Sequence, residues 1–288
     1  QRISVADGVC YELISDDFFS YTTALDNDSL IKLLHVLFKF DVDPQANEWP
    51  LCSLFCIIQN NFSRFEIFDS LFFEHFESRI ESEDKQTRIY FTRKFFEYAI
   101  LLVDMCGPYK CEQKIYECLL GIATSVYTEV EMEVYEQLRV FLGIVDFNCI
   151  QNGWPIIFSI LKAVWNSPNV KIIDNSFRSL AFVCSDCLGV LSPRDIEICI
   201  SVIGAYINQT IDLKISFRSI GLFWSFGSVD LTDQSWLQII RILRKSFNSN
   251  DLALKTEALQ TFFSITNTTS SKFSDSARIE VITEMVAP

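Results

Sequence analysis

Apolar residues in the second half of the chain recur with the period of an α-helix. Three segments begin at Asn169, Asp212 and Asp251, and they align on these polar first residues. Offsets 0, 3, 7, 8 and 11 from the first residue share one stripe of a helix with 3.6 residues per turn. The residue at offset 7 is small in each segment, which lets a neighbouring helix approach closely. The three segments are therefore predicted to be copies of one helix.

The alignment holds at four apolar offsets and at the small residue of offset 7. The aligned residues are Val170, Leu213 and Leu252 at offset 1; Ile172, Ile215 and Leu254 at offset 3; Ser176, Ser219 and Ala258 at offset 7; Phe177, Ile220 and Leu259 at offset 8; and Leu180, Phe223 and Phe262 at offset 11. The copies begin 43 and 39 residues apart.

Another amphipathic stretch precedes each copy. These stretches start near Gly153, Ser192 and Thr232, and a fourth starts near Ser274. Ser192 followed by Pro193 and Asp195 is typical of a helix N-terminus. Two antiparallel helices in about 40 residues is the spacing of HEAT and armadillo repeats. The predicted fold class is all-α, a HEAT/armadillo-like helical-repeat solenoid of antiparallel helix pairs.

The first half fits the same scheme more loosely. Alternation with a period of two residues is nowhere sustained, so no sheet is predicted. We expect an acidic helical-repeat segment over residues 1–150 and a HEAT-like segment over 151–288, divided near Asn148–Gly153 but continuous as one superhelix. The helices expected in the first half span residues 3–15, 29–40, 49–61, 64–81, 87–105, 110–127 and 130–147.

Charge divides the chain at the same place. The net charge is -13, and residues 1–150 carry 25 acidic and 12 basic residues, whereas residues 151–288 carry 12 of each. The acidic half should repel nucleic acid, so no nucleic-acid partner is expected. No apolar run approaches the ~20 residues that cross a bilayer, which favours a soluble or peripheral protein. The chain begins at Gln1 and ends within a helical pattern, so we expect a fragment of a larger protein.

Residues that carry chemistry are sparse. The two histidines, His35 and His75, lie in apolar helical stripes without a nucleophile motif nearby. Cys184 and Cys187 form a C-x-x-C match, but the context is a helix and further ligands are missing. Phosphate-binding and dinucleotide-binding glycine motifs are absent from the sequence. We therefore predict a protein with no enzymatic activity, no cofactor, no metal and no small-molecule substrate.

Basic residues on the repeat helices are the candidate partner-binding residues. A repeat solenoid presents an extended surface lined by the second helix of each pair. Basic side chains near repeat turns also satisfy backbone carbonyls or acidic caps, and that structural role is the alternative to binding. The candidates are Lys171, Lys214, Arg218 and Lys255 on the second helices, with Arg241, Arg244 and Lys245 as a second basic cluster.

Three strings of the second half carry a family resemblance. They are residues 152–158, LKISFRSIGLFWSF at 213–226 and WLQIIRILRKSFNSNDLALKTEALQTFF at 236–263. They resemble segments that follow the catalytic position in the large Arf guanine-nucleotide exchange factors. Within that superfamily they look most like the non-catalytic monensin-sensitivity scaffold of the Golgi and endosomes. The matching residues are Gly153, Trp154, Gly221, Leu222, Trp224, Ala258, Gln260, Thr261, Phe262 and Phe263.

The resemblance covers about residues 150 to 265 and implies a trafficking scaffold. A Dopey-type protein and an Arf-like small GTPase would be its partners, and the chain would be cytoplasmic and peripheral on Golgi and endosomal membranes. Nothing in the chain resembles a catalytic exchange domain. A generic HEAT-repeat adaptor or transport receptor is an alternative, and the regulatory region of an Arf exchange factor is another. An acidic lining on the second helices would favour a transport receptor, whereas a neutral or mixed lining would favour the scaffold.

Overall fold

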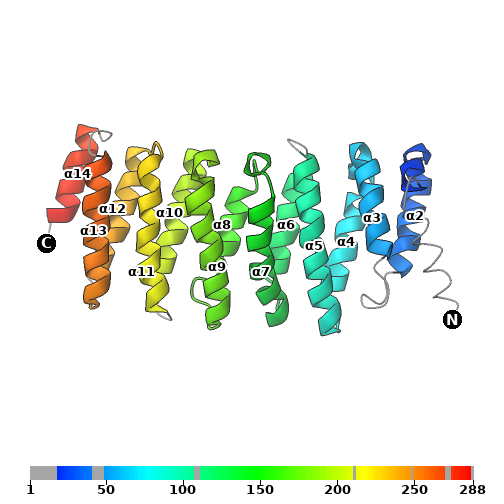
Figure 1. Ribbon diagram of the computed structural model, residues 1–288, viewed down its shortest axis with the longest axis horizontal. Helices are drawn as coiled ribbons and strands as arrows, with labels where there is room; N and C mark the ends of the chain where they lie inside the picture. The colour runs from blue at the N-terminus through cyan, green and yellow to red at the C-terminus, as the bar shows by residue number, and fades with distance from the viewer. Residues whose placement is uncertain are drawn as a thin grey trace. The chain divides into compact units, whose positions relative to one another are not determined.

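The computed structural model describes residues 18–40, 49–106, 111–209, 212–247, 249–269 and 274–286. Every regular element over these ranges is a helix, as the sequence predicts (Figure 1). The protein is an all-α helical-repeat solenoid. It divides into two compact units, Gln1–Glu133 and Val134–Pro288. This boundary lies within α7 (Thr128–Ile144) rather than at Asn148–Gly153, and the continuity of the two segments stays a prediction.

The first unit pairs its helices in chain order. α2 packs on α3, α4 on α5, and α6 on both α4 and α5. The helix expected over 3–15 lies outside the described residues. The elements are η1 (Phe18–Ala24), α2 (Asn27–Phe40), α3 (Trp49–Asn60), η2 (Phe62–Ile67), α4 (Asp69–Ile80), α5 (Lys85–Cys106), α6 (Cys111–Ala123) and the start of α7.

The single helix predicted over 64–81 is wrong, because the chain breaks at Phe68. Arg64 and Phe68 have φ angles of -125° and -126°, outside the helical range, so a 3₁₀ helix precedes α4. The break lets both Phe65 and Phe68 enter the core, where their rings meet edge to face with centroids 5.1 Å apart. Hydrophobic periodicity does not show the break because both segments are apolar on the core side.

Phenylalanine forms the core of the first unit. The buried ring of Phe76 in α4 lies 4.9 Å from Phe72, 5.8 Å from Phe91, 5.6 Å from Phe95 and 5.4 Å from Tyr98, measured between centroids. Most of these pairs are tilted or edge-to-face, the arrangements that aromatic quadrupoles favour. The phenylalanine excess therefore joins α4 to α5 rather than lining a chemical site.

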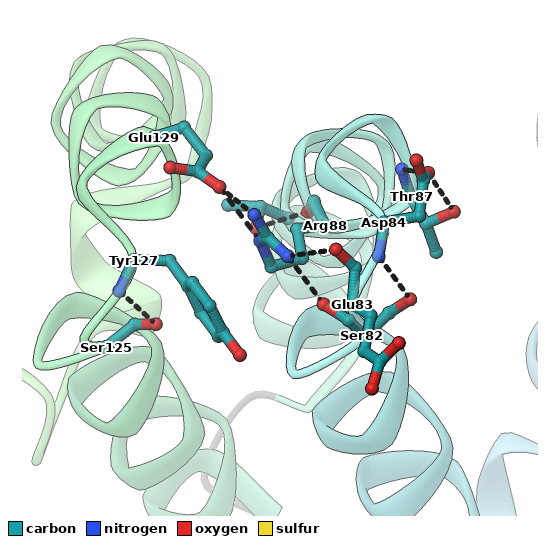
Figure 2. Close-up of polar contacts among 9 residues, drawn as sticks. Ser82, Glu83, Asp84, Thr87, Arg88, Ser125, Tyr127 and Glu129 are labelled. Atoms are coloured by element: carbon teal, nitrogen blue, oxygen red, sulfur yellow. Dashed lines mark hydrogen bonds and ion pairs between the residues drawn. The ribbon is translucent and has the colours of Figure 1, made fainter.

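A buried arginine joins two helix-connecting turns of the first unit (Figure 2). The Nη1 atom of Arg88 donates to the carbonyl oxygens of Ser82 at 2.6 Å and Glu83 at 2.9 Å. Its Nε lies 3.0 Å from Oε1 of Glu129, and the guanidinium sits 4.0 Å from the ring centroid of Tyr127. Arg88 thus ties the turn before α5 to the start of α7.

The second unit is a two-layer stack of helix pairs (Figure 1). One layer holds α8 (Trp154–Ala163), α10 (Pro193–Ile207), α12 (Asp233–Phe247) and α14 (Asp275–Val286). The other holds α9 (Val170–Phe182), α11 (Leu213–Gly221) and α13 (Leu252–Thr269). We call them the α8 layer and the α9 layer. Neighbours within each layer contact one another in chain order, and α8, α10 and α12 pack on α9, α11 and α13 respectively.

Capping residues fix the predicted helix starts. The hydroxyls of Ser192, Thr232 and Ser274 accept hydrogen bonds from the backbone N–H three residues later, at 3.1 to 3.2 Å. α8 begins directly after Gly153 with proline in its first turn. The predicted repeat starts near these four positions are confirmed.

A tyrosine explains one of the small residues at offset 7. The hydroxyl of Tyr206 in α10 lies 2.8 Å from the carbonyl oxygen of Leu161 in α8 and 2.6 Å from Oγ of Ser176 in α9. A larger side chain at position 176 would displace this hydroxyl. The small residue therefore allows a buried polar contact among three helices.

The apolar stripe lies at the contacts between pairs, with one informative exception. Residues at offsets 3 and 7 are buried in all three copies. At offset 8, Phe177 and Ile220 are fully buried, whereas Leu259 is 42% exposed. Each of the first two is followed by another helix of the α9 layer, whereas α13 is the last helix of that layer among the described residues. Burial at offset 8 therefore depends on the next helix pair.

This difference predicts unequal costs at equivalent positions. Ile220→Ala should lower the free energy of unfolding by about 2–5 kcal/mol, because it empties a closed site. Leu259→Ala should cost about 1 kcal/mol, because water already reaches the side chain. Urea unfolding followed by circular dichroism measures both values. Equal losses would show that stacking does not bury the stripe.

Candidate functional site

The predicted basic residues lie on both layers of the second unit. Lys171, Lys214, Arg218 and Lys255 are in the α9 layer, whereas Arg241, Arg244 and Lys245 are on α12 in the α8 layer. The sequence predicted these two groups, four residues on the second helices and a second basic cluster. The fold places the two groups in different layers.

Arg218 and Arg241 each contact the neighbouring helix of their layer. Nη1 of Arg218 lies 3.8 Å from Oδ1 of Asp174 in α9, and its guanidinium is 4.6 Å from the ring centroid of Phe177. Nη2 of Arg241 lies 2.6 Å from Oε1 of Glu280 in α14. Both arginines therefore support stacking, and their charges are partly compensated.

Three lysines of the α9 layer have no such compensation. The ammonium groups of Lys171, Lys214 and Lys255 make no hydrogen bond or ion pair with any described residue, and the first two are exposed. Each lysine lies in the first turns of its helix. Asn169, Asp212 and Asp251 cap these helices by accepting from the backbone N–H two residues later. Equivalent caps thus place three uncompensated cations at the same end of successive helices.

Sequence reasoning missed the apolar part of this surface. Val170, Leu213 and Leu252 at offset 1 are 46%, 57% and 77% exposed. Their signal was visible, since offset 1 is apolar in every copy although it falls outside the buried stripe. Phe217, Trp224 and Phe263 are exposed on the same layer, and they are 39%, 54% and 58% exposed respectively. Large exposed apolar groups gathered in one place mark interaction surfaces.

A groove of about 400 Å³ lies between α11 and α13. Two of the exposed apolar residues, Leu213 and Phe217, and two of the basic candidates line it. Trp224, in the 3₁₀ helix η6 (Leu222–Ser228), donates from Nε1 to Oγ1 of Thr261 in α13 at 3.2 Å. The residues that line the groove are Leu213, Lys214, Phe217, Arg218, Asp251, Ala253 and Leu254.

One residue of the second basic cluster, Arg241, lines a different groove. This groove, of about 620 Å³, lies between α8, α10 and α12, and Lys162, Arg194, Glu197 and Arg241 are among its lining residues. Nζ of Lys162 lies 3.1 Å from Oγ of Ser201 in α10. Arg244 and Lys245 are in the last turn of α12. This groove is polar, in contrast to the one between α11 and α13.

The C-x-x-C match lies in a π-helical turn, Val183–Cys187, rather than in the body of an α-helix. Cys184, Cys187 and Cys199 are buried, and the sulfur atoms of Cys184 and Cys199 are 3.9 Å apart. Burial raises the pKa of the Cys187 thiol to about 12. A thiol with this pKa holds almost no thiolate at neutral pH, so it is a poor nucleophile and metal ligand.

The buried thiols predict a slow reaction with a thiol reagent. At pH 8 the native protein should leave Cys184, Cys187 and Cys199 unmodified by iodoacetamide over minutes, because the three side chains are buried and shielded from the reagent. Denatured protein should react at all three. Peptide mass mapping after quenching measures each site, and rapid native modification of Cys187 would contradict the reading of these thiols as buried.

Other chemistry-bearing residues are packed or dispersed. His75 stacks on Phe38 with centroids 4.0 Å apart, and His35 is exposed. Among the described residues, His, Cys, Asp and Glu side chains form no group that could hold a metal ion. None of the helices in the described ranges combines the length and apolar character that crossing a bilayer requires.

Comparison with known proteins finds relatives for part of the chain. It is 31% identical over 123 residues to a MON2 homologue of Drosophila melanogaster, 33% over 75 residues to that of Xenopus laevis and 26% over 106 residues to that of Homo sapiens. These matches cover 42%, 26% and 37% of this chain but only 7%, 4% and 6% of the relatives. The chain therefore contains a MON2-like region and matches less than a tenth of the length of these relatives. No protein-family model matches the chain.

Crystal structures of engineered proteins also match parts of the chain. One crystal structure is 16% identical with a TM-score of 0.42, covering 74% of this chain and 94% of its own. Another is 16% identical with a TM-score of 0.44, covering 91% of this chain and 66% of its own.

Proposed function

We propose that this chain is a protein-binding segment of a helical-repeat scaffold in Golgi and endosomal vesicle traffic, without catalytic activity. The similarity to MON2 homologues over 123 residues carries the cellular role in this proposal. The exposed apolar and basic surface of the α9 layer carries the binding role. A large Dopey-type protein or an Arf-like GTPase would be the partner, and the chain would reach membranes peripherally through it.

The charge on the α9 layer favours a scaffold over a transport receptor for basic cargo. Lys171, Lys214 and Lys255 are uncompensated, and Asp174 is already engaged, 2.7 Å from Arg178. Asp212 and Asp251 accept hydrogen bonds from the backbone as helix caps. The lining is therefore mixed with an excess of cations, whereas a receptor for basic partners needs an acidic one.

Localisation tests the cellular role. The tagged chain, expressed in animal cells, should colocalise with Golgi or endosomal markers, and its capture should enrich an Arf-like GTPase or a Dopey-type protein at least tenfold over the tag alone. A diffuse distribution with neither protein enriched would contradict the proposal.

Two charge-reversal variants identify which basic surface binds. Changing Lys171, Lys214 and Lys255 to glutamate should reduce capture at least tenfold, because uncompensated cations attract an acidic partner directly. Changing Arg241, Arg244 and Lys245 to glutamate serves as the matched control and should leave capture within about twofold. The reverse ranking would move the binding surface to the α8 layer.

A further inference from the structure

The exposed apolar groups of α11 and the following η6 cannot be explained by a missing neighbour. Leu213, Phe217 and Trp224 belong to the middle copy, which has a helix of its own layer on either side. Leu259 differs, because its equivalents Phe177 and Ile220 are covered by the next pair. Residues at offset 1 are exposed in all three copies, so their exposure is a constant feature of the repeat.

Leu213 and Phe217 line the groove between α11 and α13, whereas Trp224, Leu252 and Phe263 are exposed on the same layer outside the lining of the groove. Leu213 and Phe217 are four residues apart on α11, and Trp224 follows seven residues later. On α13, Leu252 and Phe263 are eleven residues apart, and this spacing returns to the same helix face. α11 and α13 are in contact, and the groove of about 400 Å³ runs between their first turns. Spacings of four, seven and eleven residues are those with which one helix packs on another.

Trp224 is held in place before any partner arrives. Its indole Nε1 donates to Oγ1 of Thr261 at 3.2 Å, which fixes the ring beside α13 while half of its surface stays exposed. A fixed aromatic side chain loses little conformational entropy on binding, and tryptophan is enriched among the residues that dominate interface energies.

Basic side chains lie in and next to the groove. Lys214 and Arg218 line the groove and Lys255 lies on the adjacent turn of α13. Lys214 and Lys255 have no ion-pair partner among the described residues, so an incoming group that supplies carboxylates gains attraction without displacing an existing bond. A partner with basic flanks would meet repulsion at the same positions.

We infer that Leu213 and Phe217 in the groove, together with the exposed Trp224, Leu252 and Phe263 of the same layer, form a docking surface for an amphipathic helix whose apolar stripe is flanked by Asp and Glu. We call these five residues the docking surface. A helix that docks across two neighbouring helices buries a stripe of its side chains against both of them. This inference rests on the proposed function only in that the chain binds proteins.

A designed peptide tests the docking surface on the full 288-residue chain. The probe is a helical peptide of about 18 residues with leucine at the a and d positions of each heptad and glutamate on the flanks. One comparison peptide carries lysine in place of glutamate, and another has the same composition in scrambled order. Fluorescence anisotropy should show at least tenfold tighter binding of the glutamate peptide than of either comparison peptide.

Variants assign the binding to the docking surface. Leu213→Asp and Trp224→Ala should each weaken binding of the glutamate peptide at least tenfold, as expected for central interface residues. Val126→Asp is the matched control, because Val126 is 90% exposed in the first unit and should leave binding unchanged. Lys214→Glu with Lys255→Glu should reverse the preference toward the lysine peptide. Circular dichroism confirms that each variant is folded.

Three outcomes would overturn the inference. They are equal affinity for the three peptides, binding of the glutamate peptide that survives Leu213→Asp and Trp224→Ala, and binding to phosphatidylserine vesicles through these residues in place of the peptide. Golgi localisation with partner capture, but without peptide binding, would remove the docking surface and leave the proposed function standing. Peptide binding through the docking surface in a chain that stays diffuse in cells would support the docking surface and contradict the proposed cellular role.

Discussion

Replacing Arg88 with methionine is expected to lower the free energy of unfolding of the first unit by about 2–4 kcal/mol. The guanidinium supplies donors to the carbonyls of Ser82 and Glu83 and to Glu129, and its own side chain is 8% exposed. Methionine fills the space but leaves three acceptors without a partner. The Glu129 side chain is 22% exposed, so water can partly hydrate its carboxylate and thereby limit the loss of stability.

The control for Arg88 is Lys94→Met on the same helix. Lys94 pairs with Glu97 one turn away on the surface, and removing such a pair changes stability by no more than about 0.5 kcal/mol. Urea unfolding of both variants, followed by circular dichroism, measures the difference. Similar midpoints for the two variants would show that the Arg88 contacts do not hold the two turns together.

The same contact has a pH signature. The hydrogen bond from Arg88 holds the pKa of the Glu129 carboxyl below its usual value. A lowered folded-state pKa means that the stabilisation is present above the unfolded pKa and is lost as the pH falls through the folded value. The stability gap between the wild type and Arg88→Met should therefore be constant near neutral pH and narrow below about pH 4.

Replacing Phe76 with alanine is expected to cost the first unit about 3–5 kcal/mol. Phe76 is fully buried and contacts the rings of Phe72, Phe91, Phe95 and Tyr98 as well as His75, so no single neighbour can move to fill the cavity. Tyr21→Ala is the control, because Tyr21 is 71% exposed and its removal should change stability by about 0.5 kcal/mol or less. Thermal and urea unfolding measure both, and a loss near 1 kcal/mol for Phe76→Ala would mean that the aromatic core is loosely packed.

Local signals in the sequence predict the repeat because each signal acts within one helix. Ser192 caps α10 through a residue three positions away, and the spacing of offsets 3, 7 and 8 follows from the period of one helix, although burial at offset 8 also needs the next pair. The break at Phe68 and the π-helical turn at Val183–Cys187 have other causes. They depend on how apolar side chains enter a core built from distant residues, so periodicity does not report them.

The candidate site was predictable in residue type but not in arrangement. The seven basic residues were identified by charge, yet Arg218 faces Asp174 and Arg241 faces Glu280, partners about 40 residues away that only stacking brings near. The apolar residues at offset 1 were visible in the alignment. Whether these residues are exposed depends on which side of each helix the neighbouring pair covers. The fold sets that side.

Hydroxyl-radical footprinting of the full chain, alone and bound to the protein it captures from Golgi membranes, shows most directly where recognition takes place. Oxidation of Leu213, Phe217, Trp224 and Phe263 is expected to fall at least threefold in the complex, because a docked helix shields exposed side chains. Oxidation of Val126, in the first unit, is expected to stay unchanged. Protection confined to the outer residues of α10 and α12, with Trp224 still fully oxidised, would contradict the assignment of partner binding to the α9 layer.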